Sequence, residues 1–281
     1  MIIDAPAVDW LTFTTYENDH FQGWQDWQRK LVGDKKIGKI RMYDGEWVGS
    51  SFIGQGRQGS RPHGLVRVSG TESNQAFIDL LKIGYDKCTR LDIQFTTPLP
   101  SGYSARKFAD DLRLDQAGEY QRSVELYENS DGFDTVYVGS KKSDRFARFY
   151  VKEADDQRYL RFEIEHKNDW AQIVAKSLQS GNAEMAGVML DFLDTIKVDD
   201  TQGIIRKFHD LLDSSKAGLI NPRNISDDSA FLKWFDDQVT PACLRKAFDH
   251  EIGADLRYRL QKLLDEVNIT IGGEIDKNDL L

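Results

Sequence analysis

The stretch DRFARFYVK, residues 144–152, alternates apolar and polar side chains, and so do RLDIQFT at 90–96 and RFEIEHK at 161–167. Successive side chains on a β-strand point to opposite faces of the sheet, so each stretch predicts a strand with one apolar and one polar face. Packing against helices explains the apolar faces. The polar faces combine acids, bases and a tyrosine, which packing does not require.

The predicted polar faces carry cations, carboxylates, a phenol and two neutral side chains. They are Arg90, Asp92, Gln94 and Thr96 on the first strand, Arg148, Tyr150 and Lys152 on the second, and Arg161, Glu163, Glu165 and Lys167 on the third. Two interpretations are open. The face could be a solvated surface whose opposite charges pair across strands, or a site where these groups converge for phosphodiester chemistry.

Phosphoryl transfer explains this combination of residue types, because it needs an in-line nucleophile and positive charge on the non-bridging oxygens. A free tyrosine has a pKa of about 10, so the phenol of Tyr150 needs cations or a metal nearby to act as a nucleophile. Arg148 and Lys152 flank it at two-residue steps. Attack by Tyr150 would leave a 5′-phosphotyrosyl link and a free 3′-OH, and such a link conserves the bond energy for rejoining.

Three carboxylates on two of these strands are candidate metal ligands. Mg²⁺ and Mn²⁺ prefer oxygen ligands, which Asp92, Glu163 and Glu165 would supply. The two cysteines, Cys88 and Cys243, lie far apart without a metal-like spacing. They indicate small buried side chains in a reducing cytoplasm.

The remaining pattern predicts an α+β domain followed by a helical part. Further strands are expected at 8–16, 39–42, 65–68 and 135–138, besides 145–151 and 159–165, and helices at 21–32, 73–83 and 105–112, the last capped by Ser104. Helices then follow at 169–180, 183–196, 201–213, 227–239 and 241–265. A hinge at 218–224 would separate a mainly antiparallel α+β domain, 1–217, from a helical region, 218–281. No internal repeat is visible.

Positive charge is concentrated in two regions of an acidic chain. The net charge is −9, whereas a general nucleic-acid binder is usually basic. One basic region runs from Arg29 to Arg67 and includes Arg57 and Arg61 in the glycine-rich stretch SSFIGQGRQGSRPHG, 50–64, which predicts a loop. The other is the run Lys141, Lys142, Arg145, Arg148 and Lys152. A locally basic cleft is compatible with this pattern, because binding responds to the local field.

Membrane and secretory features are missing from the sequence. No run approaches the roughly 18 apolar residues that cross a bilayer. The first residues, MIIDAPAVDW, lack the basic and apolar regions of a signal peptide. We therefore expect a cytoplasmic protein with no membrane partner.

Several segments together resemble the trans-acting replication initiator family, which comprises initiators of Gram-positive rolling-circle plasmids and some filamentous phages, and relaxases of certain integrative conjugative elements. The segments are DWLTFT, HGLVRVSG, TRLDIQFT, TVYVGSKKSDRFARFYVK and RFEIEHK, followed by a helical part containing FLKWFDDQV. They occur in family order over residues 9–240. The combination of Y-x-G-S-[RK]-K-S, R-x-Y-x-K and R-x-E-x-E is the specific feature.

The resemblance implies a catalytic domain with the sheet layout of the HUH endonucleases but without their paired histidines. None of the five histidines lies within two residues of another. The R-x-Y-x-K match places the nucleophile at Tyr150, with Tyr137 as the alternative. The predicted DNA-binding residues are Arg90, Arg161, Lys141, Lys142, Arg145, Lys167, Arg57 and Arg61.

Thr96 departs from the family pattern, in which the strand usually reads R-x-D-x-x-x-D. A hydroxyl is a neutral and weaker Mg²⁺ ligand than a carboxylate, so either metal affinity is reduced or Glu163 and Glu165 hold the metal. The departure keeps open a non-catalytic protein that binds origin DNA without cutting it.

The predicted function is therefore that of a bacterial rolling-circle initiator or relaxase that nicks and rejoins a specific DNA origin, single-stranded or extruded as a cruciform. A helicase and a second copy of the chain are further expected partners. The alternatives are a non-catalytic origin-binding or regulatory protein, and a protein scaffold whose charged face is solvated.

Overall fold

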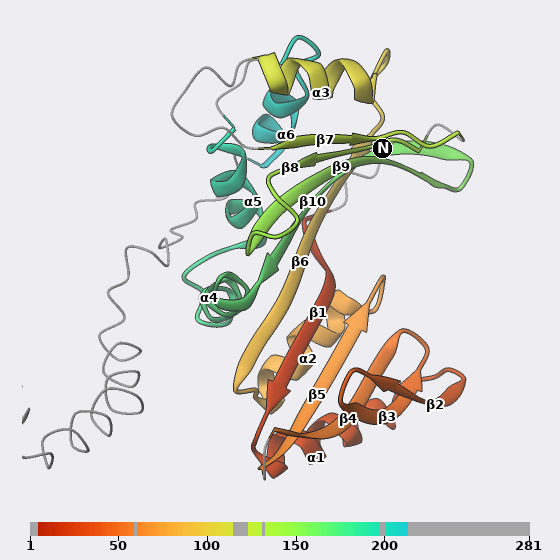
Figure 1. The fold of residues 1–281 in the computed structure, drawn as a ribbon, viewed down its shortest axis with the longest axis vertical. Helices are drawn as coiled ribbons and strands as arrows, with labels where there is room; N and C mark the ends of the chain where they lie inside the picture. The colour runs from red at the N-terminus through yellow and green to blue at the C-terminus, as the bar shows by residue number, and fades with distance from the viewer. Residues whose placement is uncertain (1–4, 59–60, 115–122, 131–132, 197–199, 213–281) are drawn as a thin grey trace, which may run out of the picture. The chain divides into compact units, whose positions relative to one another are not determined.

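The computed structural model describes residues 5–58, 61–114, 123–130, 133–196 and 200–212 (Figure 1). All of them belong to the first of two compact units of the chain, Met1–Pro222. The predicted domain boundary after residue 217 and the predicted helices at 227–239 and 241–265 lie outside the described residues and stay predictions.

Within the described residues, ten strands form one antiparallel sheet in the order β2-β3-β4-β5-β1-β6-β10-β9-β8-β7 (Figure 1). The strands are β1 (Ala7–Thr15), β2 (Lys35–Ile40), β3 (Tyr43–Val48), β4 (Ser51–Gln58), β5 (Arg61–Ser69), β6 (Lys87–Pro98), β7 (Val124–Tyr127), β8 (Thr135–Val138), β9 (Arg145–Ala154) and β10 (Gln157–Lys167). The helices are α1 (Asn18–Gln28), α2 (Ser73–Ile83), α3 (Ala105–Leu114), α4 (Asn168–Gln179), α5 (Met185–Leu193) and α6 (Ile204–Leu212). The predicted α+β class with a mainly antiparallel sheet is confirmed.

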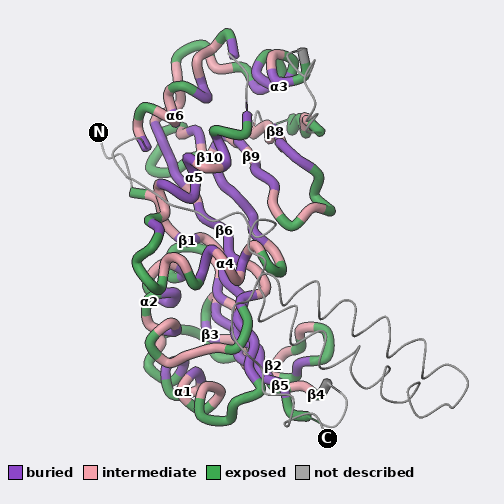
Figure 2. The backbone as a smooth tube through the Cα atoms, turned by 90° about the vertical axis from the view of Figure 1, so that its left-hand side faces the viewer, coloured by how far each residue is buried: buried purple, intermediate pink, exposed green. Residues whose placement is uncertain are grey.

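Apolar side chains of the central strands point to one face of the sheet, where the helices pack. Phe149 of β9 and Phe162 of β10 stack with ring centroids 4.7 Å apart, and Phe208 of α6 lies 5.7 and 5.4 Å from them. Leu91 and Ile93 of β6 are fully buried in the same cluster. Burial of each such side chain contributes about 1.5–3 kcal/mol, and the purple central strands of Figure 2 mark this core.

The fold contains a repeat that the sequence does not reveal. The elements β1-α1-β2-β3-β4-β5-α2 and β6-α3-β7-β8-β9-β10-α4 follow the same order, and their strands occupy equivalent positions on either side of the β1–β6 pair. These two strands pair symmetrically about Leu11 and Leu91, which face each other, because the register shifts once on each side of that pair. A local two-fold axis thus makes Thr12 equivalent to Asp92 and Trp10 equivalent to Arg90. These pairs share no chemistry, which is why the repeat is hidden in the sequence.

The loop predicted at 50–64 is wrong, because β4 and β5 occupy most of it and pair with each other. β3 and β7 are further strands that the sequence did not predict. A Cβ on Gly54 would lie 2.6 Å from the ring of Phe52, and one on Gly45 would lie 2.0 Å from the carbonyl oxygen of Ile53. These glycines allow close packing inside strands, and they interrupt the alternation by which a strand is recognised.

The strand predicted at 39–42 is wrong in its second half, because β2 ends at Ile40 and the turn to β3 follows. The other predicted elements within the described residues are confirmed with small shifts of their ends. The helix predicted at 73–83 coincides with α2, and Ser104 caps α3 by accepting a 3.3 Å hydrogen bond from the amide of Lys107. In the part of the chain that the structure describes, no helix is long and apolar enough to cross a membrane.

Candidate active site

β6, β10 and β9 are neighbours in the sheet, so the three alternating stretches present one shared polar face. In the register, Asp92 faces Glu165, and Glu163 faces Arg148. Tyr150 is two residues along β9 from Arg148 and therefore points to the same side. The structure thus brings the phenol, the three carboxylates and their cations to one surface, as the sequence predicted.

Glu163 links the tyrosine to an arginine. The hydroxyl of Tyr150 donates a 2.8 Å hydrogen bond to Oε2 of Glu163. Arg148 donates from Nη2 to the other carboxylate oxygen, Oε1, and the same Nη2 lies 3.5 Å from Oδ2 of Asp92. A phenol, a carboxylate and a guanidinium are therefore in continuous contact across β9 and β10.

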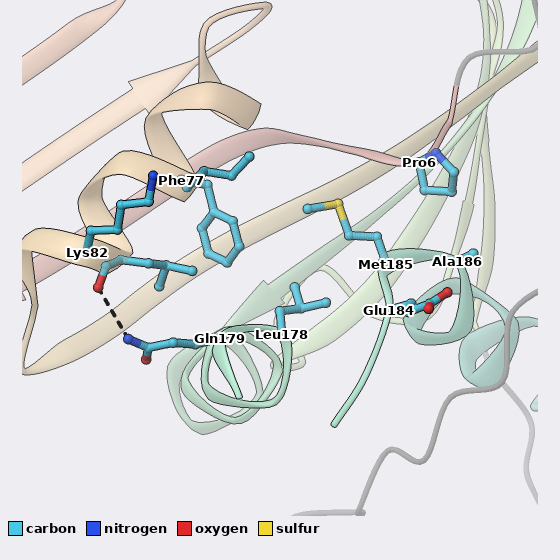
Figure 3. A pocket seen from close by; sticks show the side chains of 10 residues that line it. Pro6, Phe77, Lys82, Leu178, Gln179, Glu184, Met185 and Ala186 are labelled. Carbon is cyan, nitrogen blue, oxygen red and sulfur yellow. Dashed lines mark hydrogen bonds between the residues drawn. The ribbon is translucent and has the colours of Figure 1, made fainter. Parts of the chain in front are cut away.

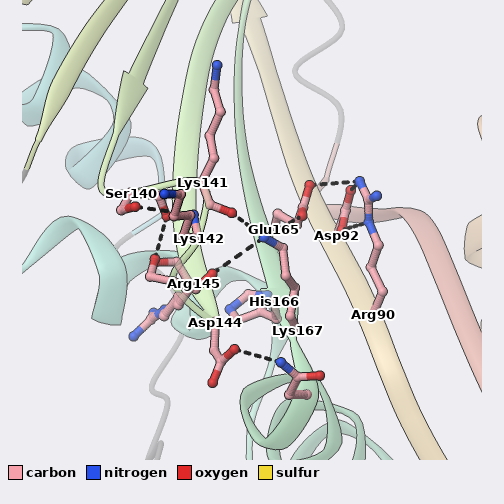
Figure 4. Close-up of polar contacts among 12 residues, drawn as sticks. Arg90, Asp92, Ser140, Lys141, Lys142, Asp144, Arg145, Glu165, His166 and Lys167 are labelled. Atoms are coloured by element: carbon pink, nitrogen blue, oxygen red, sulfur yellow. Dashed lines mark hydrogen bonds and ion pairs between the residues drawn. The ribbon is translucent and has the colours of Figure 1, made fainter.

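Arg90 and Lys167 bind the carboxylates on the β6 side of this cluster (Figure 4). Arg90 donates to both oxygens of Asp92, at 2.9 and 2.6 Å, and its Nη2 lies 2.8 Å from Oε2 of Glu165. The ammonium of Lys167 lies 3.3 Å from Oε1 of Glu165. Every carboxylate predicted for the site therefore has a positively charged partner.

Asp9 is a fourth carboxylate of the cluster, and sequence reasoning assigned it no role. The pairing of β1 with β6 shifts between Val8 and Trp10, which makes Asp9 the extra residue of a β-bulge. Bulges re-aim a side chain relative to regular alternation. Oδ1 of Asp9 lies 3.6 Å from Nη1 of Arg161. Burial raises the pKa of Asp9, and the negative charge of Glu163 raises it further.

The burial of these acids excludes a merely solvated surface. Asp92 and Glu163 are 0% exposed and Glu165 is 8% exposed. Removing a carboxylate from water costs several kcal/mol even after relaxation, and an ion pair often does no more than offset that cost. A buried cluster of paired charges is therefore a poor source of stability and is typical of functional sites.

The protonation of Tyr150 follows from its surroundings. Burial raises the pKa of its phenol above the ordinary value, and the charge of Glu163 raises it further, against the weaker opposite effect of Arg161. Tyr150 is therefore protonated at neutral pH and needs a base to become a nucleophile. Burial also raises the pKa of Asp92, although the hydrogen bonds from Arg90 oppose this shift.

Thr96, at the position of the family's second acid, belongs to the same polar face. Its hydroxyl accepts a 3.0 Å hydrogen bond from Nε of Arg161 and donates a 2.9 Å hydrogen bond to Gln94. The neutral side chain therefore holds an arginine in place beside Tyr150.

Comparison with solved structures supports the fold, whereas comparison of the sequence with known families and proteins finds no match. No family model matches the chain, and no curated protein matches its sequence. A solved structure of a rolling-circle replication initiator protein from Geobacillus stearothermophilus superposes with a TM-score of 0.56 at 16% identity, covering 77% of this chain and 99% of that protein. This chain has a rolling-circle initiator fold.

At this level of identity the likeness to the initiator extends to the fold alone. A second structure, DynU16 from the dynemicin biosynthetic locus, aligns with a TM-score of 0.22 at 10% identity, over 61% of this chain and 92% of its own. That TM-score is too low to carry an argument.

Within the initiator fold, the alternative nucleophile Tyr137 lies on β8, opposite Arg148. The ammonium of Lys141 lies 3.7 Å from the centroid of its ring, and Lys141 also pairs with Glu125 at 3.5 Å. Lys142 is exposed in the turn before β9. Both tyrosines thus lie beside Arg148, and Tyr150 is distinguished by its contact with Glu163.

Arg145 does not belong to the polar face, so its predicted DNA contact stays a prediction that its position does not support. Regular alternation on β9 places it with Ala147 on the helix side, where its side chain is 8% exposed and Nη1 lies 2.6 Å from Oδ2 of Asp191 on α5. His166 is fully buried on the same side, as alternation predicted, and its Nδ1 donates a 3.1 Å hydrogen bond to the carbonyl of Leu91.

The other predicted basic residues differ in their distance from the cluster along the sheet. Lys152 follows Tyr150 on the polar face of β9, opposite Tyr159. Arg57 and Arg61 are exposed on β4 and β5, which lie on the far side of β1 from the carboxylates. These two arginines are therefore outside the catalytic cluster, and their role in DNA binding stays a prediction.

The donor chemistry of the carboxylates fits Mg²⁺ or Mn²⁺, but their arrangement does not. Among the residues that the structure describes, no three acidic, histidine or cysteine side chains are placed to hold one ion. Guanidinium groups instead bind the oxygens of Asp92 and Glu163. Metal binding by Asp92, Glu163 and Glu165 stays a prediction that requires these arginines to move.

A pocket of about 730 Å³ lies elsewhere, among α2, the end of α4 and the start of α5 (Figure 3). Its lining is mainly apolar, with Phe77, Leu178 and Met185 facing the space, and it contains none of the site residues. It lacks the converging titratable groups that a reaction needs, so we place the candidate site at the charged cluster.

Proposed function

We propose that this protein is a rolling-circle replication initiator or relaxase that cuts one strand of its DNA origin through Tyr150 and later rejoins it. The observation that carries the proposal is the hydrogen bond from Tyr150 to Glu163, whose other oxygen is bound by Arg148. The initiator fold supports it, because the protein from Geobacillus stearothermophilus is a rolling-circle replication initiator.

Glu163 acts as the general base in this mechanism. It accepts the phenolic proton while the oxygen of Tyr150 forms a bond to phosphorus and the bond from phosphorus to the 3′ oxygen breaks. The 3′ oxygen takes a proton from solvent, which leaves a 5′-phosphotyrosyl link and a free 3′-OH. Rejoining reverses these steps, since a 3′-OH attacks the phosphotyrosine and Glu163 returns the proton to Tyr150.

Arginine and lysine side chains around Tyr150 supply positive charge for the phosphate. Arg161 and Lys152 lie on the same face and bind its non-bridging oxygens, while Arg148 holds Glu163. Mg²⁺ or Mn²⁺ held by Asp92, Glu163 and Glu165 would add positive charge, and no step above depends on it.

The test is formation of a covalent adduct between the full chain and DNA. Single-stranded oligonucleotides tiled across the DNA segment that carries its gene are incubated with the protein and Mg²⁺ or Mn²⁺, then analysed on a denaturing gel. We expect an adduct with the natural protein and with Tyr137→Phe, and none with Tyr150→Phe. An adduct in Tyr150→Phe that disappears in Tyr137→Phe would reassign the nucleophile.

Thr96 and the arginine-bound carboxylates favour one alternative, a non-catalytic protein that binds or regulates an origin. That function predicts salt-dependent DNA binding without an adduct in any metal ion. Recruitment of a helicase and pairing with a second copy of the chain are further proposals that the initiator role entails.

A further inference from the structure

Guanidinium and indole groups alternate in a row across the polar face, beside the carboxylate cluster. The guanidinium of Arg67 on β5 lies 3.9 Å from the ring centroid of Trp10 on β1 and 5.8 Å from that of Trp47 on β3. The guanidinium of Arg90 on β6 lies 4.3 Å from the same Trp10 ring. The row therefore runs Arg90, Trp10, Arg67, Trp47, and its first member is also the partner of Asp92.

Arg67 differs from the other arginines of this face in lacking a carboxylate. Arg90, Arg148 and Arg161 are each paired with one. Within the described chain Arg67 has no acidic partner, and its buried Nε has no hydrogen-bond partner. A half-buried cation beside a second cation is unfavourable without a counter-charge. The site therefore suits an anionic group from outside the described residues.

The local two-fold axis shows what Arg67 replaces. Arg67 faces Thr12 across β1 and β5, just as Glu165 faces Asp92 across β6 and β10. In the first half of the sheet, a cation thus occupies the position that a catalytic carboxylate occupies in the second half. The two halves of the polar face are therefore suited to different tasks, the second to chemistry and the first to binding an anion.

We propose that Arg67, Trp10 and Trp47 form a binding site for single-stranded DNA, which continues the path of the strand from Tyr150. Arg67 binds a phosphate, the two indoles hold its guanidinium in one orientation, and their exposed parts stack with unpaired bases. Both indoles are half-buried, so part of each ring faces solvent. Lys36 of β2 is exposed and lies directly opposite Trp47 in the register, so it extends the positive charge of this face beyond Trp47.

The choice of a single strand rests on the proposed function, because Arg90 joins this row to the cluster where one strand is cut.

Fluorescence anisotropy with labelled oligo(dT) of about 20 nucleotides measures the affinity of the full chain over a range of NaCl concentrations. We expect Arg67→Ala to weaken binding about tenfold. The slope of log K against log [NaCl] should become shallower by about 0.7, the value for one phosphate contact to a single strand. Arg206→Ala is the matched control, since this exposed arginine lies on α6 and should change neither quantity.

Equal effects of the two substitutions, or none, would overturn the proposal. Arg67→Lys retains the charge without the planar group that stacks, so we expect it to keep the salt slope and to bind with intermediate affinity. If circular dichroism shows that Arg67→Ala does not fold, Arg67→Lys tests the proposal in its place. Binding by Arg67→Lys that equals the natural protein would refute the role of stacking. Loss of affinity for duplex DNA alone would assign the surface to a duplex and refute a single-strand site.

The outcome is separable from that of the cutting mechanism. If no variant forms an adduct but Arg67→Ala still weakens binding, the cutting function fails and the DNA site stands. If adducts form and depend on Tyr150 while Arg67→Ala binds normally, the reverse holds.

Discussion

The hydroxyl of Tyr150 donates its 2.8 Å hydrogen bond to Glu163 although the residue directly opposite Tyr150 in the register is Arg161. The contact is diagonal across β9 and β10, and the guanidinium of Arg161 lies 6.0 Å from the centroid of the tyrosine ring. The phenol is therefore placed between an acceptor for its proton and a cation. Because burial keeps Tyr150 protonated, the acceptor decides whether it can react.

Replacing the acceptor tests this relationship. Glu163→Gln retains the shape of the side chain and an oxygen for the hydrogen bond, but an amide cannot take the proton. We expect the single-turnover rate of adduct formation to fall by about 10²- to 10⁴-fold. Glu153→Gln, an exposed residue at the end of β9, is the matched control and should react at the natural rate. Unchanged kinetics in Glu163→Gln would show that another group accepts the proton.

Asp9 should affect the reaction through Arg161, which it contacts at 3.6 Å. Asp9→Asn leaves Arg161 less firmly oriented, so we expect adduct formation to slow by about tenfold to a hundredfold. DNA affinity should stay the same or increase, since a negative charge is removed from the path of the phosphate. Asp210→Asn on α6 is the control. Weaker DNA binding at an unchanged reaction rate would contradict a positioning role.

Regular alternation determined how much of this site the sequence could predict. It places Asp92, Tyr150 and Glu163 on one face because β6, β9 and β10 continue without a bulge between them. Asp9 was missed because its bulge breaks the rule that alternation relies on. Arg145 was assigned to DNA because it belongs to a basic run, although alternation by itself places it on the helix side.

The first half of the sheet was harder to predict from the sequence. Glycines such as Gly45 fit inside its strands through close contacts with a neighbouring strand, which a one-dimensional pattern does not contain. The equivalence of Arg67 with Glu165 depends on pairing in space and leaves no trace in residue identity. The fold class could therefore be predicted, whereas the repeat and the unpaired arginine required the structure.

His166 should make the stability of the fold sensitive to acid. Burial lowers the pKa of His166 from 6.5 to about 3, so the unfolded chain binds the proton more readily than the folded protein. Its contribution to stability is complete above about pH 6.5 and is lost as the pH falls toward 3, by up to about 1.4 kcal/mol per pH unit.

Urea unfolding of the natural protein and of His166→Gln between about pH 4 and pH 7 measures this contribution. Other titrating groups are common to both proteins, so the difference in the free energy of unfolding isolates His166. We expect the natural protein to lose stability more steeply than the variant as the pH falls. Parallel curves would show that the pKa of His166 is the same in the folded and the unfolded state.

Metal binding should compete with the arginines of the site. Since Arg90 and Arg148 occupy the oxygens of Asp92 and Glu163, we expect only weak Mn²⁺ binding by isothermal titration calorimetry, and none in Asp92→Asn. Thr96→Asp adds a carboxylate on the same face beside Arg161 and should tighten Mn²⁺ binding, because charged oxygen ligands bind this ion better than a hydroxyl. Thr71→Asp, in the exposed turn before α2, adds the same charge elsewhere and should have no effect. Tight Mn²⁺ binding that survives Asp92→Asn would place the metal outside this cluster. Stronger Mn²⁺ binding and faster adduct formation in Thr96→Asp would show that Thr96 limits metal binding at the natural site.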